Sequence, residues 1–209
     1  MEDVLTVYQR PPDAAYPVLC MDETSKQLVE ETRISLPVGP GQPRREDYEY
    51  ERHGVANLFL FCEPLTGWRE VRVTERRTRS DWAEAMRDLS DRFYPTAQRI
   101  TVVLDNLNTH GSASFYEAFA PEEARRLAER FEFHYTPKHG SWLNMAEIEF
   151  SVLSRQCLDR RIGEVGLLRR EIEAWQQKRN AISKTIDWQF TTTVDARIKL
   201  KRLYPVIKA

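Results

Sequence analysis

The amino-acid sequence predicts an α/β fold in which a mixed sheet is covered by helices. Short apolar runs recur along the chain and end at turn-forming residues, which is typical of strands. Elsewhere apolar residues recur every three or four positions, as on amphipathic helices. The early strands follow one another with hairpin features, whereas the later strands alternate with helices. A five-stranded sheet with antiparallel and parallel pairs is therefore expected.

The first part of the chain is expected to hold three strands. Residues 18–21 form a short apolar run, which we interpret as a buried strand. Residues 36–53 are rich in proline, glycine and charge, which predicts a loop with a short edge strand around residues 48–50. The aromatic run at residues 56–61 and the alternating run at residues 68–73 predict two strands paired as a hairpin.

The second part of the chain alternates between helix and strand. The run ITVVL is continuously apolar, which is typical of a strand buried on both faces. A proline at the first turn marks the start of one helix. The expected elements, in chain order, are a helix over residues 79–93, a strand over residues 100–104, a helix over residues 121–130, a fifth strand over residues 131–135, and helices over residues 141–158 and 165–182.

These elements predict one domain, over residues 17–182, in a chain of 209 residues. The proline-broken residues 1–16 are expected to be a tether. Residues 183–209 are expected to be a basic tail. No apolar run approaches the roughly 18 residues of a membrane span, and the N-terminus lacks an apolar signal core. The three widely spaced cysteines predict reduced thiols, so we expect a cytoplasmic protein without a membrane partner.

Charge alone identifies no partner, because 31 Lys and Arg balance 32 Asp and Glu. A near-zero net charge still permits DNA binding, since acidic metal ligands offset a basic DNA-contacting surface. The basic residues gather in two places, one in the middle of the chain and one near its C-terminus. They are Arg76, Arg77 and Arg79, and then Arg197, Lys199, Lys201 and Arg202.

Two aspartates follow apolar strands directly, Asp22 after VLCM and Asp105 after TVVL. Strand ends in α/β folds are places where ligand sites form, and neighbouring strands would bring both carboxylates together. Two such anions repel, so the site favours a cation, and oxygen-only ligands suit magnesium or manganese. For either aspartate alone, the plainer interpretation is a residue that caps the next turn.

A third acid is expected near the start of a later helix. Glu147 follows the run HGSWLNMA, one helical turn after Leu143. A rigid helix could direct it at the two aspartates. Glu149 has similar apolar neighbours, so spacing does not separate the two glutamates, and either one could be a solvated helix carboxylate.

Taken together, three sequence blocks resemble the catalytic blocks of the DDE endonucleases. They are MDET around Asp22, VVLDNLNTH around Asp105 and HGSWLNMAE around Glu147. The branch they resemble is the bacterial insertion-sequence transposases related to mariner elements, and the resemblance runs from about residue 17 to 204. The resemblance implies a ribonuclease H-like catalytic domain over residues 17–182. It also identifies Glu147, and not Glu149, as the third acid.

The chain departs from this family pattern at two places. Met145 and Ala146 stand where many relatives have Pro-Ile or Pro-Val. The segment between the second and third acids is also longer than usual, which an insertion around residues 113–124 explains.

The resemblance implies two-metal phosphoryl transfer, with two Mg²⁺ or Mn²⁺ ions about 3.5–4 Å apart. Water would cut a strand at each transposon end, and the freed 3′-hydroxyl would attack target DNA. Asp22, Asp105 and Glu147 would hold the ions. The partners implied are inverted-repeat DNA ends, target DNA and a second copy of the chain. Relatives recognise the ends with an N-terminal helix-turn-helix, which we expect from another region or a separate chain. A bacterial, nucleoid-associated location follows from the same resemblance.

Several polar residues are candidates for DNA contact beside these acids. They are Asn106, His110, Lys138 and His139 near the blocks, and Arg197, Lys199 and Lys201 near the C-terminus. A strand or extended tail carrying the last three would lie on phosphates and add affinity without sequence preference. The plainer interpretations are that the first group holds local backbone and that the C-terminal group is a solvated face.

Two other functions compete with transposition. A domesticated or truncated module would bind DNA without cutting it, although keeping three acids close together without a metal is costly. A related nuclease acting on RNA–DNA hybrids would share the fold and the metal chemistry. For the two glutamates, we expect Glu147→Gln to reduce DNA cleavage severely and Glu149→Gln to reduce it mildly.

Overall fold

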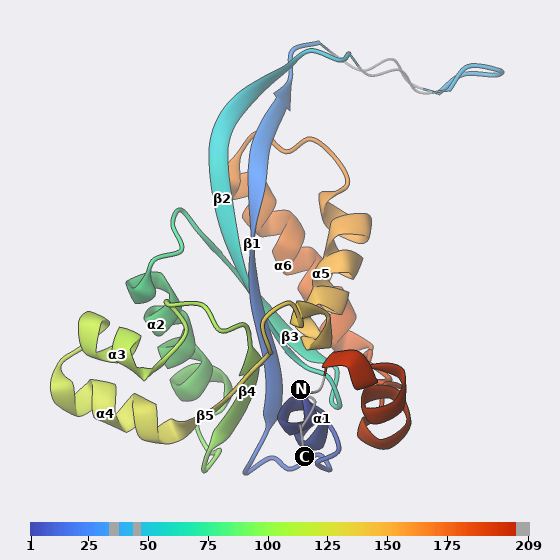
Figure 1. Ribbon diagram of the computed structural model, residues 1–209. Coiled ribbons are helices and arrows are strands. Elements are labelled where there is room, and N and C mark those ends of the chain that lie inside the picture. Colours follow the sequence, from blue (N-terminus) through green and yellow to red (C-terminus); the bar gives the residue numbers. More distant parts are fainter. Residues whose placement is uncertain (34–37, 44–46, 204–209) are drawn as a thin grey trace.

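The computed structural model describes residues 1–33, 38–43 and 47–203. Its sheet has five strands in the order β3-β2-β1-β4-β5 (Figure 1). β1 pairs antiparallel with β2 and parallel with β4, β2 pairs antiparallel with β3, and β4 pairs parallel with β5. This confirms the predicted mixed sheet. The strands are β1 (Val18–Glu31), β2 (Tyr50–Glu63), β3 (Trp68–Thr74), β4 (Ile100–Leu104) and β5 (Phe131–Tyr135).

The pairing directions bring four strand ends to one edge of the sheet. Since β3 and β1 are both antiparallel to β2, they run the same way, and β4 and β5 follow β1 in parallel. The carboxyl ends of β3, β4 and β5, and the point where β1 passes them, therefore lie at the same edge. We call this the carboxyl edge.

Helices cover both faces of the sheet and enclose two hydrophobic clusters (Figure 1). Side chains of a strand alternate between the faces. Accordingly, Leu19 and Met21 pack with α2, α3 and α4, whereas Cys20 packs with α1, α5 and α6. The helices are α1 (Glu2–Val7), α2 (Arg79–Asp88), α3 (Ser112–Ala118), α4 (Pro121–Arg130), α5 (Ala146–Leu153) and α6 (Val165–Ala181).

The helices on the α2 side largely follow the predicted boundaries. α2 begins with a capping box in which Thr78 and Asp81 satisfy each other's backbone N–H groups, so Thr78 is the cap. α2 continues into a π-helical turn, η1 (Leu89–Phe93). α4 begins at Pro121, as predicted. The segment interpreted as an insertion contains α3, whose Phe115 is fully buried between α2 and α4.

The helix expected over residues 141–158 is divided into three parts. They are a 3-10 turn, η2 (Ser141–Leu143), then α5, and then a π-helical turn, η3 (Ser154–Leu158). Asn144 is extended, with ψ near 111°, and this interrupts the helix directly before α5. α5 therefore starts as a separate element at the carboxyl edge.

The N-terminal segment is not a simple tether, because residues 2–7 form α1. Val4, Leu5 and Val7 are buried in the same cluster as α5 and α6, and this burial stabilises the helix despite its short length. The C-terminal segment is also partly helical, as η4 (Thr192–Lys199) and η5 (Lys201–Leu203). The predicted tail extends beyond the described residues, to residue 209.

β1 and β2 extend far past the other strands as a two-stranded ribbon (Figure 1). β4 pairs only with Val18–Cys20 of β1, and β3 pairs only from Asn57 onward in β2. We call residues 26–31 and 50–56, which pair only with each other, the β1–β2 arm. The expected strand at residues 18–21 and the expected edge strand near residue 48 are therefore too short. Part of the loop predicted between them lies outside the described residues.

The root of the arm rests on the connection between η3 and α6. The backbone N–H of Val29 donates to the carbonyl of Ile162 at 2.9 Å, and Lys26 Nζ donates to the carbonyl of Leu158 at 2.8 Å. Leu28 is buried in the α5–α6 cluster. In the described part of the chain, no helix is long and apolar enough to cross a membrane.

Candidate active site

The register of β1 and β4 places Asp22 and Asp105 on the same side of the sheet. The last pair that β1 and β4 form with each other is Cys20 with Val103, and both residues pack in the cluster that contains α5. Each aspartate lies two residues further along the chain, so alternation turns both carboxylates toward that same side. Glu147 enters from α5. The three acids thus come from three different elements at the carboxyl edge.

The pKa of Asp22 is raised by its surroundings. Burial is the main cause, the carboxylates of Asp105 and Glu147 add to it, and a hydrogen bond from the backbone N–H of Glu23 and the charge of His110 oppose it, so that the pKa is about 7. That hydrogen bond is 2.8 Å long. The influence of both other acids on Asp22 shows that the three carboxyl groups form one electrostatic cluster.

Asp105 is oriented by the end of the neighbouring strand. Its Oδ1 accepts a hydrogen bond of 2.7 Å from the hydroxyl of Thr136, the first residue after β5. The backbone N–H of Thr136 in turn donates to the carbonyl of Leu104, the last residue of β4. This contact continues the β4–β5 pairing by one residue and holds the carboxylate at a fixed place on the edge.

Asn144 connects the start of α5 to β1. Its side chain is fully buried, and Nδ2 donates to the carbonyl of Met21 at 2.8 Å, directly before Asp22. Its Oδ1 accepts from the backbone N–H of Ala146 at 3.1 Å, directly before Glu147. One amide therefore fixes the separation of the two backbones that carry these acids. Sequence reasoning missed this role, because the partner of Asn144 lies 123 residues away.

Glu149 is a buried structural anion, not the solvated carboxylate that the sequence left open. Its Oε1 accepts from Arg179 of α6 at 2.8 Å, and Oε2 lies 3.1 Å from Arg69 Nε of β3. The second contact is an ion pair without the alignment of a hydrogen bond. The side chains of Glu149 and Arg69 are each 1% exposed. These contacts anchor α5 to the sheet and to α6.

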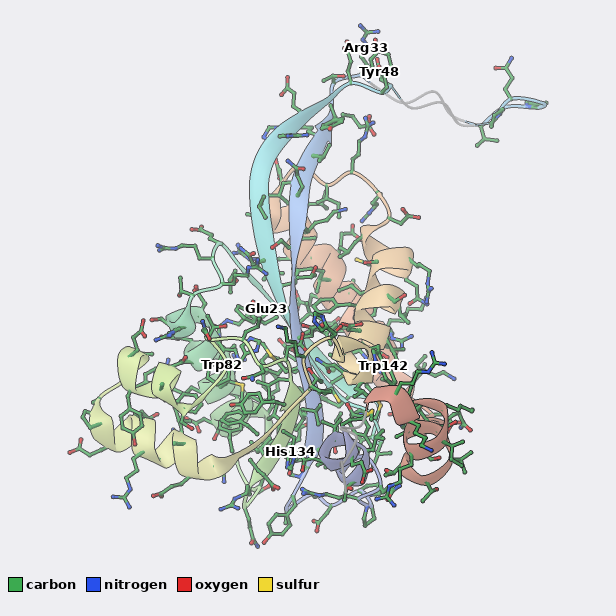
Figure 2. All side chains as sticks on the ribbon, in the orientation of Figure 1. Glu23, Arg33, Tyr48, Trp82, His134 and Trp142 are labelled. Carbon is green, nitrogen blue, oxygen red and sulfur yellow. The ribbon has the colours of Figure 1, made fainter. Side chains whose placement is uncertain are left out.

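His110, a candidate for DNA contact, has a buried side chain. One ring nitrogen lies 2.9 Å from the carbonyl oxygen of Asp105, the other lies 3.4 Å from Glu23, and the ring stacks on Trp82. Its position fits the plainer interpretation, a residue that holds the loop after β4. Glu23 also lies 3.7 Å from Arg77. Figure 2 labels Glu23 part-way along β1, above the part of the molecule that holds Trp82.

The other candidates near the acids are exposed at the carboxyl edge. Asn106 lies in the loop after β4, and Lys138 and His139 lie in the loop after β5. His139 adopts a left-handed backbone conformation, with φ near 62°, which marks a sharply turned loop. The structure thus brings these three side chains to the edge that holds the carboxylates.

The C-terminal candidates lie in helical turns, so the expectation of a strand or extended tail is wrong. Arg197 is ion-paired with Glu2 of α1 at 2.6 Å, and Lys199 is ion-paired with Asp195 at 2.6 Å. Lys201 is exposed in η5. These residues remain at the surface beside α1, on elements separate from those that carry the acids.

The donor set of the three acids suits a hard divalent cation. It consists of carboxylate oxygens, and in the described part of the chain none of Asp22, Asp105 and Glu147 forms an ion pair with a lysine or arginine. A bound divalent cation would balance their charge. Among the described residues, no three His, Cys, Asp or Glu side chains are arranged so that they could hold an ion as they stand. The oxygen donors of the three acids fit the chemistry of such an ion.

A sheet in the order 3-2-1-4-5, with helices on both faces, defines a ribonuclease H-like domain. The chain also matches the DDE superfamily endonucleases over residues 17–169. It therefore belongs to this family. No curated protein matches the chain.

Solved structures of Mos1 have the same fold. The chain aligns with the Mos1 mariner paired-end complex with Mn at a TM-score of 0.55 and 16% identity, and with the complex containing Mg at 0.54 and 18%. It aligns with the Mos1 strand transfer complex at a TM-score of 0.58 and 15% identity. Each match covers 87% of this chain and 53–54% of the other. The chain thus spans about half the length of these proteins, and the predicted ribonuclease H-like fold is confirmed.

Proposed function

We propose that the chain is the catalytic domain of a transposase from a bacterial insertion sequence of the mariner-like branch. It would cut DNA strands at transposon ends and join them to target DNA, using Asp22, Asp105 and Glu147. The observation that carries this proposal is that β1, the end of β4 and the first turn of α5 bring three carboxyl groups to the carboxyl edge, where both other acids act on Asp22. Family membership supports endonuclease chemistry at such a cluster.

The three acids would hold Mg²⁺ or Mn²⁺, two ions in each site. Bound there, the ions would activate the attacking oxygen and stabilise the charge that develops on the phosphate. Mos1 complexes have been solved with each of these metals, which supports the choice. Because burial and the neighbouring acids raise the pKa of Asp22 to about 7, the carboxyl group would have to release its proton on binding an ion.

The remaining residues of the site would position the acids. Thr136 holds the carboxylate of Asp105, and Asn144 holds the backbones beside Asp22 and Glu147. Productive geometry in phosphoryl transfer depends on such positioning, since the reacting oxygens must lie in line. Asn106, Lys138 and His139 are exposed at the same edge and would contact DNA phosphates beside the acids.

The partners proposed are the inverted-repeat ends, target DNA and a second copy of the chain. Mos1 forms paired-end complexes and a strand transfer complex, which supports both DNA and a dimer as partners. Recognition of the ends would come from a helix-turn-helix region or a separate chain. Such a protein would act in the bacterial cytoplasm, at the nucleoid.

A nicking assay tests the proposal. Supercoiled DNA carrying inverted repeats is incubated with Mg²⁺ or Mn²⁺ and either the wild type, Asp105→Ala or Asp159→Ala. Asp159 is an exposed acid at the end of η3 and serves as the matched control. We expect cleavage by the wild type and the control, and at least a hundredfold loss in Asp105→Ala. Equal cleavage by all three would refute the role of the acids.

The competing function is a domesticated or truncated module that binds DNA without cutting it. It would give no cleavage by the wild type even when a partner supplies end recognition. A nuclease for RNA–DNA hybrids would instead cut a hybrid duplex faster than DNA of the same sequence. The same assay with both substrates separates these functions.

A further inference from the structure

The loop between β3 and α2 carries basic residues to the carboxyl edge. This loop consists of Glu75, Arg76, Arg77 and Thr78, all of them exposed. It follows Thr74, which pairs with Asn57 of β2, and Asn57 pairs with Ser25 of β1. Ser25 is three residues past Asp22 along β1. The loop therefore leaves the sheet just beyond the acids, on the side of β3.

Hydrogen bonds hold this loop in place. Asn57 Nδ2 donates to the carbonyl of Glu75 at 3.0 Å, and the hydroxyl of Ser25 donates to Asn57 Oδ1 at 2.8 Å. The hydroxyl of Thr74 donates to the carbonyl of Arg76 at 2.6 Å. The capping box of Thr78 then fixes the start of α2. A loop fixed at both ends loses little conformational entropy on binding a ligand.

The arginines of this loop differ in their partners. Arg77 is half exposed and lies 3.7 Å from Glu23, whose own side chain is only 6% exposed and which directly follows Asp22. Arg76 forms no ion pair with any residue that the structure describes. Arg79, in the first turn of α2, is instead paired with Glu117 of α3 at 2.8 Å. Arg76 and Arg77 thus retain guanidinium groups that can bind an anion beside the acids.

We propose that Arg76 and Arg77 bind two backbone phosphates of the DNA strand that lies across the carboxyl edge, on the side of β3. A guanidinium presents a planar pair of donors that matches the two free oxygens of a phosphodiester. Lys138 and His139 lie at the β5 side of the same edge, so basic residues flank the acids on both sides. The inference rests on the proposed function, because it takes the strand being cut as the ligand.

The experiment measures binding without cleavage. A fluorescent inverted-repeat duplex is titrated with the full chain in EDTA, at salt concentrations from 50 to 200 mM, and the anisotropy gives Kd. The variants are Arg76→Gln, Arg77→Gln and the double variant. Arg99→Gln is the matched control, since Arg99 is exposed directly before β4, at the opposite edge of the sheet. Thermal melting checks that each variant folds.

We expect the double variant to bind at least tenfold more weakly at 50 mM salt. Each lost phosphate contact lowers the slope of log K against log salt by about 0.9, so the double variant should lose a slope of about 1.8. Arg77→Lys, which keeps the charge, should recover part of the loss, and the control should bind like the wild type. Arg76→Gln alone tests the inference without removing the ion pair between Arg77 and Glu23.

Binding by the double variant that equals the wild type would overturn the inference, and so would absence of wild-type binding at 50 mM salt. An equal loss in Arg99→Gln would also overturn it, because the effect would then reflect overall charge. Failure of the nicking assay, by contrast, would refute the proposed cleavage and leave this binding result unchanged, because the titration contains no divalent metal.

Discussion

Replacing Glu149 with glutamine should strongly destabilise the fold. The substitution keeps the size of the side chain and removes its charge, so Arg69 and Arg179 lose their common partner. Arg69 is 1% exposed, and burial lowers its pKa while the charge of Glu149 opposes this effect. Without that carboxylate, a buried guanidinium would remain without a counter-charge. The mild effect expected for Glu149→Gln therefore concerns DNA cleavage, not the stability of the fold.

The magnitude follows from the burial of the pair. Removing one partner of a buried ion pair costs about 3–5 kcal/mol, because the remaining charge stays out of water. For a chain of this size each kcal/mol lowers Tm by roughly 2–4 °C, so the loss amounts to about 6–20 °C. Surface pairs such as Arg125 with Glu129 contribute far less, because water screens their charges.

The measurement is urea unfolding together with thermal melting, and Glu147→Gln is the matched control on the same helix. We expect no loss of stability in Glu147→Gln, because that change removes repulsion with Asp22. Cleavage measured well below the lowered Tm should still be present in Glu149→Gln and absent in Glu147→Gln. Stability of Glu149→Gln within about 1 kcal/mol of the wild type would refute the reasoning.

Three further predictions concern the acids and their supports. Asp22→Asn should stabilise the chain by about 2–4 kcal/mol at pH 8 and much less at pH 5, because the raised pKa keeps the native carboxyl protonated between about pH 4 and 7 while the unfolded one is ionised. Urea midpoints at the two pH values check this, and an equal effect at both would contradict it. Mn²⁺ should raise Tm more at pH 8 than at pH 6, since Asp22 must release its proton to bind, and should leave the Tm of Asp105→Ala unchanged. Asn144→Ala should cost about 2–3 kcal/mol and reduce cleavage at least tenfold, because two buried hydrogen bonds are lost. Ser90→Ala, which removes one buried hydrogen bond from Arg130 directly before β5, at the edge of the sheet opposite the acids, should affect stability alone, and equal cleavage loss in both variants would refute a positioning role.

Strands and helices with strong local signals could be predicted from the sequence. The continuously apolar β4 and the proline-started α4 have the predicted boundaries, because their patterns depend only on near neighbours. The positions of Asp22 and Asp105 at strand ends were also predictable. α1 was missed, because its six residues form a helix only when tertiary packing buries Val4, Leu5 and Val7.

The supporting contacts of the site were beyond sequence reasoning. The roles of Glu149 and Asn144 depend on residues of β3, α6 and β1 that are distant in the chain. His110 looked like a DNA contact because a histidine follows an acid, but packing on Trp82 buries it. The arm was underestimated because its polar residues give no apolar signal, and its strands are held by backbone pairing.

The two-residue distance from Cys20 to Asp22, and from Val103 to Asp105, limits how such a chain can vary during evolution. Inserting or deleting one residue between Cys20 and Asp22, or between Val103 and Asp105, would turn that carboxylate to the α2 side of the sheet, away from Glu147. Changes of length are tolerated in the segment around α3 or in the arm, since neither alters this count. Homologues should therefore differ freely in the lengths of the segments that separate the acids. The number of residues from the last β1–β4 pair to each aspartate should stay the same.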